Sequence, residues 1–235
     1  MTDISYKPIQ QVKVSTMIVD QIKTHILEGK LQPGDALPSE RDLMKAFKVS
    51  RSSLREALKI LDATGYVTVA QRKRTRVKSI VAETVTEPLR PLLKKDMATV
   101  LEVHDVRRSL ESWNARYAAE KATEEDMEAM GNCITAMEKK LAENQSLNKE
   151  DAAFHLAISA ATHNKIQTHL MYSINSLIQD TVGICYESQD NREILKEHQD
   201  IFLAIQARDP DLAAEKMTWH LDRIRERIHT FFAKK

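Results

Sequence analysis

The spacing of apolar residues predicts a mostly helical chain with one small β-sheet. In residues 14–28, isoleucines and a valine recur four positions apart, which is the pattern of an amphipathic helix. Two further helical segments follow, "ERDLMKAFK" and "RSSLREALKILDATG". The period then changes to that of β-strands in "YVTVA" and "RVKSIV", on either side of the basic tip "QRKRT". Three helices followed by a two-stranded hairpin are typical of a winged helix-turn-helix.

Turn and capping residues support these boundaries. Gly29 and Gly65 stand where the first and third helices should end, and glycine is the preferred residue just beyond a helix. Ser39 and Ser50 precede the second and third helices, where a serine hydroxyl can accept a hydrogen bond from the helix-start amides. We therefore expect three separate helices within residues 14–65.

The second part of the chain keeps a helical period to its end. Helices are expected near 99–121, 124–142, 147–161, 164–187, 191–208 and 210–232. No strand pattern interrupts them, so this part should be an all-α bundle of about six helices. The stretch "AETVTEPLRPLLKK" contains two prolines and indicates a linker or a broken helix. The expected domains are residues 1–80, a winged helix-turn-helix, and 99–235, the bundle, joined by a linker of 81–98.

Composition narrows the class of protein. Hydrophobic residues make up 42% of the 235 positions, enough for a real core. No apolar run approaches the roughly 18 residues of a membrane span, and the N-terminus lacks a secretion-signal pattern. Two cysteines, Cys133 and Cys185, are too few for a disulfide framework. We expect a cytoplasmic protein with no membrane partner.

The net charge of +1 conceals an asymmetry between the two parts. Residues 1–80 carry 15 Lys and Arg against 8 Asp and Glu, whereas residues 81–235 carry 20 against 26. A basic first third on an acidic remainder suggests a nucleic-acid-binding module joined to a different second domain. Chance patchiness is the alternative explanation.

The third helix has the residues of a DNA recognition helix. Such a helix enters the major groove with its N-terminus first, where arginine can bind guanine and hydroxyls can bind phosphate. The basic tip can neutralise further phosphates. The expected DNA-binding residues are Arg41, Ser50, Arg51, Ser52, Ser53, Arg55, Arg72, Lys73 and Arg74. The alternative is a solvated basic face on an ordinary three-helix unit.

Residues 14–78 resemble the DNA-binding domain of GntR-family bacterial transcription regulators. The segments "GKLQPGDALPSERDL", "VSRSSLREAL" and "LDATG" match that family's motifs in order. The resemblance implies that Arg41, Arg51 and Arg55 contact DNA, aided by the helix-start hydroxyls and the wing. The wing departs from the family pattern: it is often glycine-rich, but here it is "QRKRTRV". We expect this tip to rely more on charge than on close backbone approach.

An acid and three histidines lie on apolar helix faces of the second domain. Asp151 and His155 are one helical turn apart, and His198 and His220 share stripes with isoleucine, leucine and methionine. A divalent metal would compensate a carboxylate buried there. This donor set suits Zn²⁺, and also Ni²⁺, Mn²⁺ or Fe²⁺. Alternatively, each histidine is simply a core residue with a satisfied hydrogen bond.

Residues 99–232 resemble the FCD effector domain of the FadR-like branch of GntR regulators. "DVRRSLESWNARYAAEKAT" and "DAAFHLAISAATHN" carry its R-x-x-L-E and D-x-x-F-H motifs. The resemblance implies that Asp151, His155, His198 and His220 ligate one metal ion, and that Arg107 points into the same cavity. It also implies a small carboxylic acid as effector. Asn175 is a further candidate for this cavity. An acyl-CoA pocket without metal occurs in the branch, but retention of the acid and all three histidines argues against it.

The function that fits these observations is a ligand-controlled transcription regulator, expected to be a repressor. A single helix-turn-helix reads one half-site, so we expect a homodimer on a near-palindromic operator. The alternatives are a metalloenzyme with a DNA-binding localiser, or a DNA-binding dimer without an effector. No general base or nucleophile motif supports the enzyme, and Glu111 and Glu150 are expected to be ordinary surface or packing residues. His104, His163, His169 and His229 are also expected to be surface or packing residues.

Overall fold

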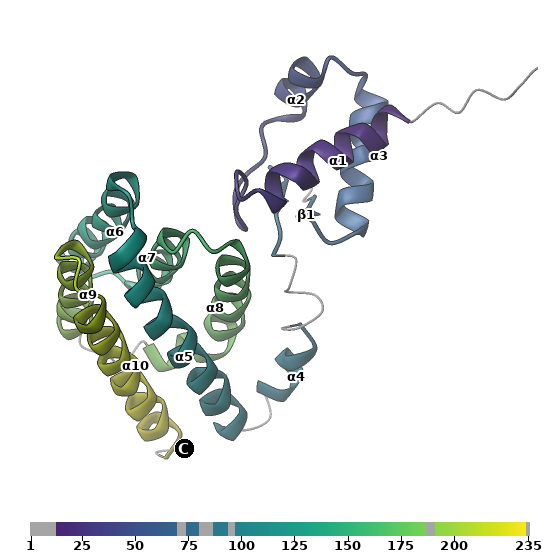
Figure 1. The fold of residues 1–235 in the computed structure, drawn as a ribbon. Helices are drawn as coiled ribbons and strands as arrows, with labels where there is room; N and C mark the ends of the chain where they lie inside the picture. Colours follow the sequence, from purple (N-terminus) through teal and green to yellow (C-terminus); the bar gives the residue numbers. More distant parts are fainter. Residues whose placement is uncertain (1–12, 70–73, 80–86, 94–96, 187–190, 234–235) are drawn as a thin grey trace, which may run out of the picture. The chain divides into compact units, whose positions relative to one another are not determined.

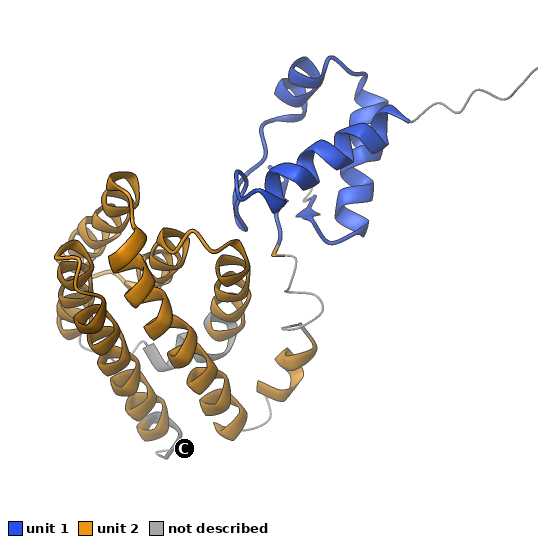
Figure 2. Cartoon of the chain, in the orientation of Figure 1, with its two compact units in different colours: residues 1–78 blue, residues 79–235 orange. Residues whose placement is uncertain are grey.

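The chain forms two compact units, residues 1–78 and 79–235 (Figure 2). The computed structural model describes residues 13–69, 74–79, 87–93, 97–186 and 191–233. The expected linker, residues 81–98, belongs with the second unit, and its described residues form two short helical segments and the start of the long helix that follows.

The first unit is a winged helix-turn-helix. Three helices precede a two-stranded antiparallel sheet: α1 (Val14–Leu27), α2 (Glu40–Phe47), α3 (Arg51–Ala63), β1 (Val67–Thr68) and β2 (Arg76–Val77) (Figure 1). Val67 pairs with Val77 in the sheet. The paired strands are shorter than the sequence pattern suggests, because only two residues of each form the ladder among the described positions. The fold class predicted from the sequence is confirmed.

The helices of this unit begin and end at the expected signals. Ser39 and Ser50 are the N-caps of α2 and α3, and their hydroxyls accept hydrogen bonds from backbone amides three residues on. Gly29 and Gly65 follow α1 and α3 with φ of 75° and 76°, a left-handed conformation that glycine adopts without steric cost. These caps fix where α3 starts, and therefore which side chains it presents at its N-terminus.

The second unit is a helical bundle. Its described elements are the 3-10 helix η2 (Glu87–Leu89) and the α-helices α4 (Arg90–Leu93), α5 (Met97–Lys121), α6 (Glu124–Ala142), α7 (Asn148–Ala161), α8 (Lys165–Tyr186), α9 (Asn191–Gln206) and α10 (Pro210–Ala233) (Figure 1). Thr123 and Asp126 form a reciprocal capping box at the start of α6. Helices α5 to α10 lie close to their predicted ranges, and side chains of Thr123, Asn164 and Asp209 cap the starts of α6, α8 and α10.

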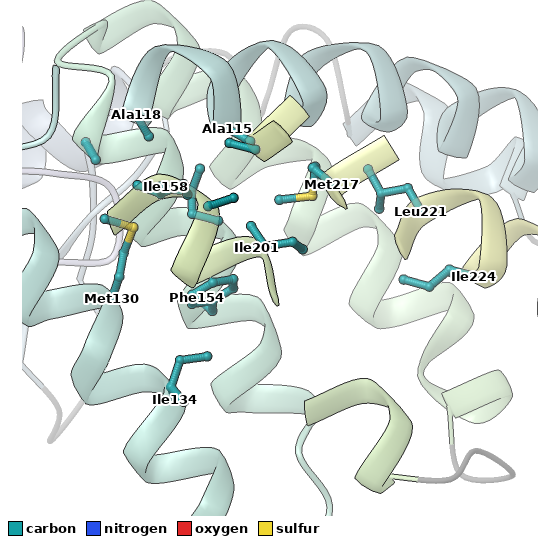
Figure 3. Close-up of a cluster of buried hydrophobic side chains, with 14 of the residues drawn as sticks. Ala115, Ala118, Met130, Ile134, Phe154, Ile158, Ile201, Met217, Leu221 and Ile224 are labelled. Atoms are coloured by element: carbon teal, nitrogen blue, oxygen red, sulfur yellow. The ribbon is translucent and has the colours of Figure 1, made fainter. Parts of the chain in front are cut away.

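An apolar core holds these helices together around α5. Helix α5 packs along α10 and also contacts α7, α8 and α9, so several elements meet at its inner face. Figure 3 shows Phe154, Ile158, Ile201 and Met217 in the middle of this core. The candidate metal ligands come from α7, α9 and α10, and they are therefore held in a packed interior rather than on a loop. Among the described helices, none is both long and apolar enough to cross a membrane.

Candidate metal centre and DNA-binding surface

The start of α3 presents an exposed arginine beside a cluster of serine hydroxyls. Arg51 is exposed at the first helical position. The Ser50 hydroxyl accepts a hydrogen bond from the Ser53 amide at 3.3 Å and lies 2.9 Å from the hydroxyl of Ser52. The Ser50 hydroxyl therefore caps the helix, and both Ser50 and Ser52 remain exposed to solvent. Cationic and hydroxyl groups at a helix N-terminus form an arrangement that suits phosphate and base edges.

The other arginines of this unit differ in how they are held. Arg41 is exposed on α2, and Arg74 is exposed beside the wing. Arg55 donates from Nε to Glu40 at 3.3 Å, an exposed ion pair that links α3 to α2. Arg76 bonds the carbonyl of Gly34 at 2.6 Å and so ties the wing to the preceding loop. The predicted wing contacts Arg72 and Lys73 lie outside the described residues.

The four predicted metal ligands converge in the interior of the second unit. One donor atom from each of Asp151, His155, His198 and His220 lies within 4.8 Å of the others. Nε2 of His198 is 3.0 Å from Oδ1 of Asp151 and 3.3 Å from Nε2 of His155. Atoms that bind one ion at about 2.0–2.2 Å are separated by roughly 3–3.5 Å in tetrahedral or octahedral geometry. The two separations from Nε2 of His198 fall in this range, and the separation of 3.8 Å between Nε2 of His155 and Oδ1 of Asp151 is slightly wider.

An oxygen atom lies close to Nδ1 of each of the three rings. Nδ1 of His198 is 2.7 Å from the carbonyl of Ile194, Nδ1 of His220 is 2.6 Å from a carboxylate oxygen, and Nδ1 of His155 contacts another. A neutral imidazole carries one proton, and these acceptors place it on Nδ1. With that proton on Nδ1, the Nε2 atoms of His155 and His198 are free to bind an ion, and they lie 3.3 Å from each other. Among the described residues, Nε2 of His220 has no hydrogen-bond partner. A metal ion fits this set of acceptors.

Glu111 is a functional residue that the sequence did not single out. It was expected to be an ordinary surface or packing residue, but it is 1% exposed, and its carboxylate contacts both Nδ1 of His155 and Nε of Arg107. Burial opposes its ionisation, yet Arg107 and His155 together lower the pKa of Glu111 to about 2. Two signals were available: Glu111 is the last residue of the R-x-x-L-E motif, and it stands four residues from Arg107, a spacing at which side chains meet on a helix face.

Glu197 is the second residue that was missed. It neighbours His198 in the chain, but its side chain contacts His220 of α10, and its other oxygen is 3.2 Å from Arg227. Burial raises the pKa of Glu197, against the lowering effect of Arg227 and Arg223. The sequence held no signal for this contact, since it depends on how α9 packs against α10.

The electrostatics of the cluster favour an ionised Asp151 and a neutral His220. Burial opposes ionisation of Asp151, but His198 and His155 hold the pKa of its carboxyl well below the usual range. Burial is also the main reason that the pKa of His220 lies well below that of a free imidazole, so His220 is neutral. Metal ions bind the ionised carboxylate and the neutral imidazole, which are the forms favoured at Asp151 and His220.

The two predicted effector contacts are both buried beside the cluster. Arg107 is 2% exposed and donates from Nε to Glu111. Asn175 is 7% exposed, and its amide donates to the carbonyl of Ala152 at 3.2 Å, next to Asp151 in the chain. Arg107 thus has a partner inside the protein, and the effector role of both residues stays a prediction.

The remaining histidines take no part in the cluster. His104 is buried, with Nε2 2.8 Å from the carbonyl of Leu221. His163 pairs with Asp126 at 3.0 Å at the surface, and His229 is exposed. His169 is buried on α8 and accepts hydrogen bonds at its backbone carbonyl.

Comparison with known proteins gives the same two-part organisation. The model of bacterial regulatory proteins of the gntR family matches residues 14–77, and the FCD domain model matches residues 102–223. A solved structure described as Streptococcus agalactiae GntR, 24% identical, superposes with a TM-score of 0.58 over 90% of this chain and 99% of the other. At that identity the likeness concerns the fold.

Curated relatives match almost the whole chain. The HTH-type transcriptional regulator LutR of Bacillus subtilis is 32% identical over 88% of this chain and 97% of its own length. The Glc operon transcriptional activator of Escherichia coli K12 is 31% identical over 92% and 89%. The HTH-type transcriptional repressor NanR of Cronobacter sakazakii is 29% identical over 93% and 86%. The chain therefore belongs to the GntR family, and it is a DNA-binding transcription regulator with a C-terminal FCD effector domain rather than an enzyme.

Proposed function

We propose that the second unit is a metal-dependent receptor for a small carboxylic acid, and that this ligand controls the affinity of the first unit for an operator. One observation carries the proposal: the carboxylate of Asp151 and one ring nitrogen from each of three buried histidines converge, while Nδ1 of each ring lies against another oxygen atom. A purely structural core has no reason to turn four acceptors toward one point, because their mutual repulsion is destabilising.

Asp151, His155, His198 and His220 would hold the ion. Nitrogen and oxygen donors of this kind suit zinc best, and nickel, manganese and iron are also compatible. A bound ion supplies open coordination positions that a carboxylate can fill. Arg107 and Asn175 are the proposed effector contacts, since a cation and an amide beside the ion favour an organic anion.

The DNA side of the proposal rests on the exposed N-terminus of α3. Arg51 would read base edges, with Arg41, Arg55 and Arg74 on the flanking surface. One such module reads a half-site, so we propose a homodimer on a near-palindromic operator, acting as a repressor in the cytoplasm. The relatives named above include both an activator and a repressor. A reporter gene under the operator would therefore show whether this protein lowers or raises transcription.

The test is a DNA-binding titration with metal-loaded and chelator-treated protein, using an operator selected from random duplexes. Lactate, glycolate, pyruvate, citrate and gluconate would be added one at a time. We expect one class of carboxylate to change operator affinity at least about 10-fold in the metal-loaded protein only, a coupling of about 1.4 kcal/mol. Protein that holds no metal and binds DNA equally with every acid would instead be a DNA-binding dimer without an effector.

A further inference from the structure

Two buried carboxylates lie at the Nδ1 side of two of the candidate metal-ligand rings. Oε2 of Glu111, on α5, contacts Nδ1 of His155, on α7. Oε2 of Glu197, on α9, lies 2.6 Å from Nδ1 of His220, on α10. Each glutamate thus reaches a ring from a different helix. The orientation of the two rings therefore depends on how these four helices pack.

Each carboxylate also has a cationic partner on its second oxygen. Oε1 of Glu111 accepts a hydrogen bond from Nε of Arg107, and both side chains are at most 2% exposed. Oε1 of Glu197 lies 3.3 Å from Nε of Arg223 and 3.2 Å from Nη2 of Arg227. A buried carboxylate without compensation is costly, so these arginines allow the glutamates to remain ionised beside the rings.

We infer that Glu111 and Glu197 are positioning residues of the metal centre, and that Arg107 acts on the metal through Glu111. A carboxylate at Nδ1 keeps the imidazole proton there and leaves the Nε2 lone pair facing the cluster. The inference deepens the proposed function and rests on it, because it assigns these residues a role toward the proposed ion.

His198 provides an internal comparison. Its Nδ1 is 2.7 Å from the carbonyl of Ile194, a backbone group that no side-chain substitution removes. The tautomer of His198 should therefore be insensitive to the glutamates, whereas those of His155 and His220 should depend on them. This difference separates a positioning role from a general loss of structure.

The inference also gives Arg107 a role that is distinct from effector binding. If Arg107 served only the effector, its replacement would leave metal affinity unchanged in buffer without carboxylates. If it holds Glu111 in place, Arg107→Gln lowers metal affinity even when no effector is present. The two roles are separated by one measurement.

The experiment compares Glu111→Gln, Glu197→Gln and Arg107→Gln with the parent by zinc competition against a fluorescent chelator, without carboxylates. Glutamine has nearly the size of glutamate but lacks its charge. We expect each variant to bind zinc about 10- to 100-fold more weakly, the usual effect of losing such a partner. Glu120→Gln, an exposed position on the same helix α5, is the matched control and should stay within about twofold of the parent.

A second readout needs no metal. Nitrogen-15 NMR of the metal-free parent should show His155, His198 and His220 protonated on Nδ1. Glu111→Gln should disturb the signal of His155 and leave that of His198 in place, and Glu197→Gln should do the same to His220. If Glu111→Gln fails to fold because Arg107 loses its counter-charge, the double variant Arg107→Gln/Glu111→Gln removes both charges and takes its place.

The outcomes are distinguishable. A parent that binds zinc tightly, with folded glutamine variants that bind it equally well, overturns the positioning role and leaves the proposed function standing. A parent that binds no divalent metal overturns the proposed function. In that case the positioning role toward an ion is overturned as well, and changed tautomers in the variants would show only that the glutamates orient the rings.

Discussion

At the scale of single residues, His198 is the ligand whose removal is easiest to interpret. Its Nδ1 donates to a backbone carbonyl, so replacing His198 removes no side-chain partner from this side of the ring. We expect His198→Ala to reduce bound metal and to abolish the rise in melting temperature when zinc is added to chelator-treated protein. An ion that binds only the native state at 100 times its Kd stabilises by about 2.7 kcal/mol.

The comparison between zinc-free and zinc-loaded protein separates binding from packing, because the cavity left by the substitution is present in both. Elemental analysis and thermal unfolding are the measurements. His229→Ala, at an exposed position of α10, is the control and should keep the full zinc response. Equal metal content in His198→Ala and the parent would exclude His198 as a ligand.

His104 should make the protein less stable in mild acid. The ring is 2% exposed, and burial, helped by the nearby Arg107 cation, lowers its pKa from 6.5 to about 4 against the opposite pull of Glu111 and Asp105. The unfolded chain therefore binds a proton first as pH falls from 6.5 to 4, and the folded state loses up to about 3 kcal/mol relative to it.

The free energy of unfolding of His104→Gln, measured with urea in a chelator between pH 4 and 7, should fall less steeply than that of the parent. Glutamine can still donate to the carbonyl of Leu221, which is 2.8 Å from Nε2 of His104. Parallel curves for the two proteins would show that His104 is not the cause of the pH dependence of stability.

The residues of the candidate site differ in how visible they are from sequence. Asp151, His155, His198 and His220 stand out because each is a polar residue on an apolar helix face. Glu111 is marked only as the last residue of the R-x-x-L-E motif, and Glu197 is not marked at all, because glutamate is common on helices and its burial is decided by a neighbouring helix. Sequence periodicity thus reveals an unusual residue on a face, but not the partner that another helix brings to it.

At the scale of elements, α3 should determine operator recognition through its first turn. Arg51 is exposed at the helix start, whereas Lys59 is exposed about two turns further along the same helix. We expect Arg51→Ala to weaken operator binding by about 1–3 kcal/mol and to relax sequence preference, because a base contact is lost. Fluorescence anisotropy with specific and scrambled duplexes measures both effects.

Lys59→Ala is the matched control, since it removes one exposed cation of α3 without touching its N-terminus. It should weaken specific and scrambled duplexes alike, or neither. An equal loss in both variants on both duplexes would mean that α3 supplies only general attraction for phosphate, and the recognition-helix assignment would fail.

The helices themselves were predicted closely, and the sheet less so. Helices α5 to α10 have long apolar periods, with signals such as the Thr123–Asp126 capping box, so local sequence determines them. The wing has only two paired residues in each described strand, and the pairing is set by contacts with the loop at Gly34 and Ala36. Short strands carry too little periodicity to fix such a register.

At the scale of the whole molecule, the two units have separate cores. One contains Ile18, Ile22, Leu54 and Leu58, and the other surrounds Phe154. The sequence indicated this division through its charge asymmetry and its change of period after Gly65. Because the candidate metal ligands lie wholly in the second unit, the effect of the metal on stability should be confined to that unit.

Removal of the metal should therefore loosen one unit and leave the other unchanged. We expect chelation to speed amide hydrogen exchange in α7, α9 and α10, since the ion would join these helices, while exchange in α1, α2 and α3 stays the same. Exchange measured by mass spectrometry resolves the two sets of peptides. Both tryptophans, Trp113 and Trp219, lie in the second unit, so their fluorescence gives an independent melting curve for it.

Variants with fewer ligands provide the control for this experiment. In His198→Ala, chelator should no longer alter exchange in α7 or α10, because no tightly bound ion remains to be removed. A chelator effect that persists in this variant, or one that spreads equally over α1 to α3 in the parent, would mean that the ion does not act by joining the three helices of the bundle.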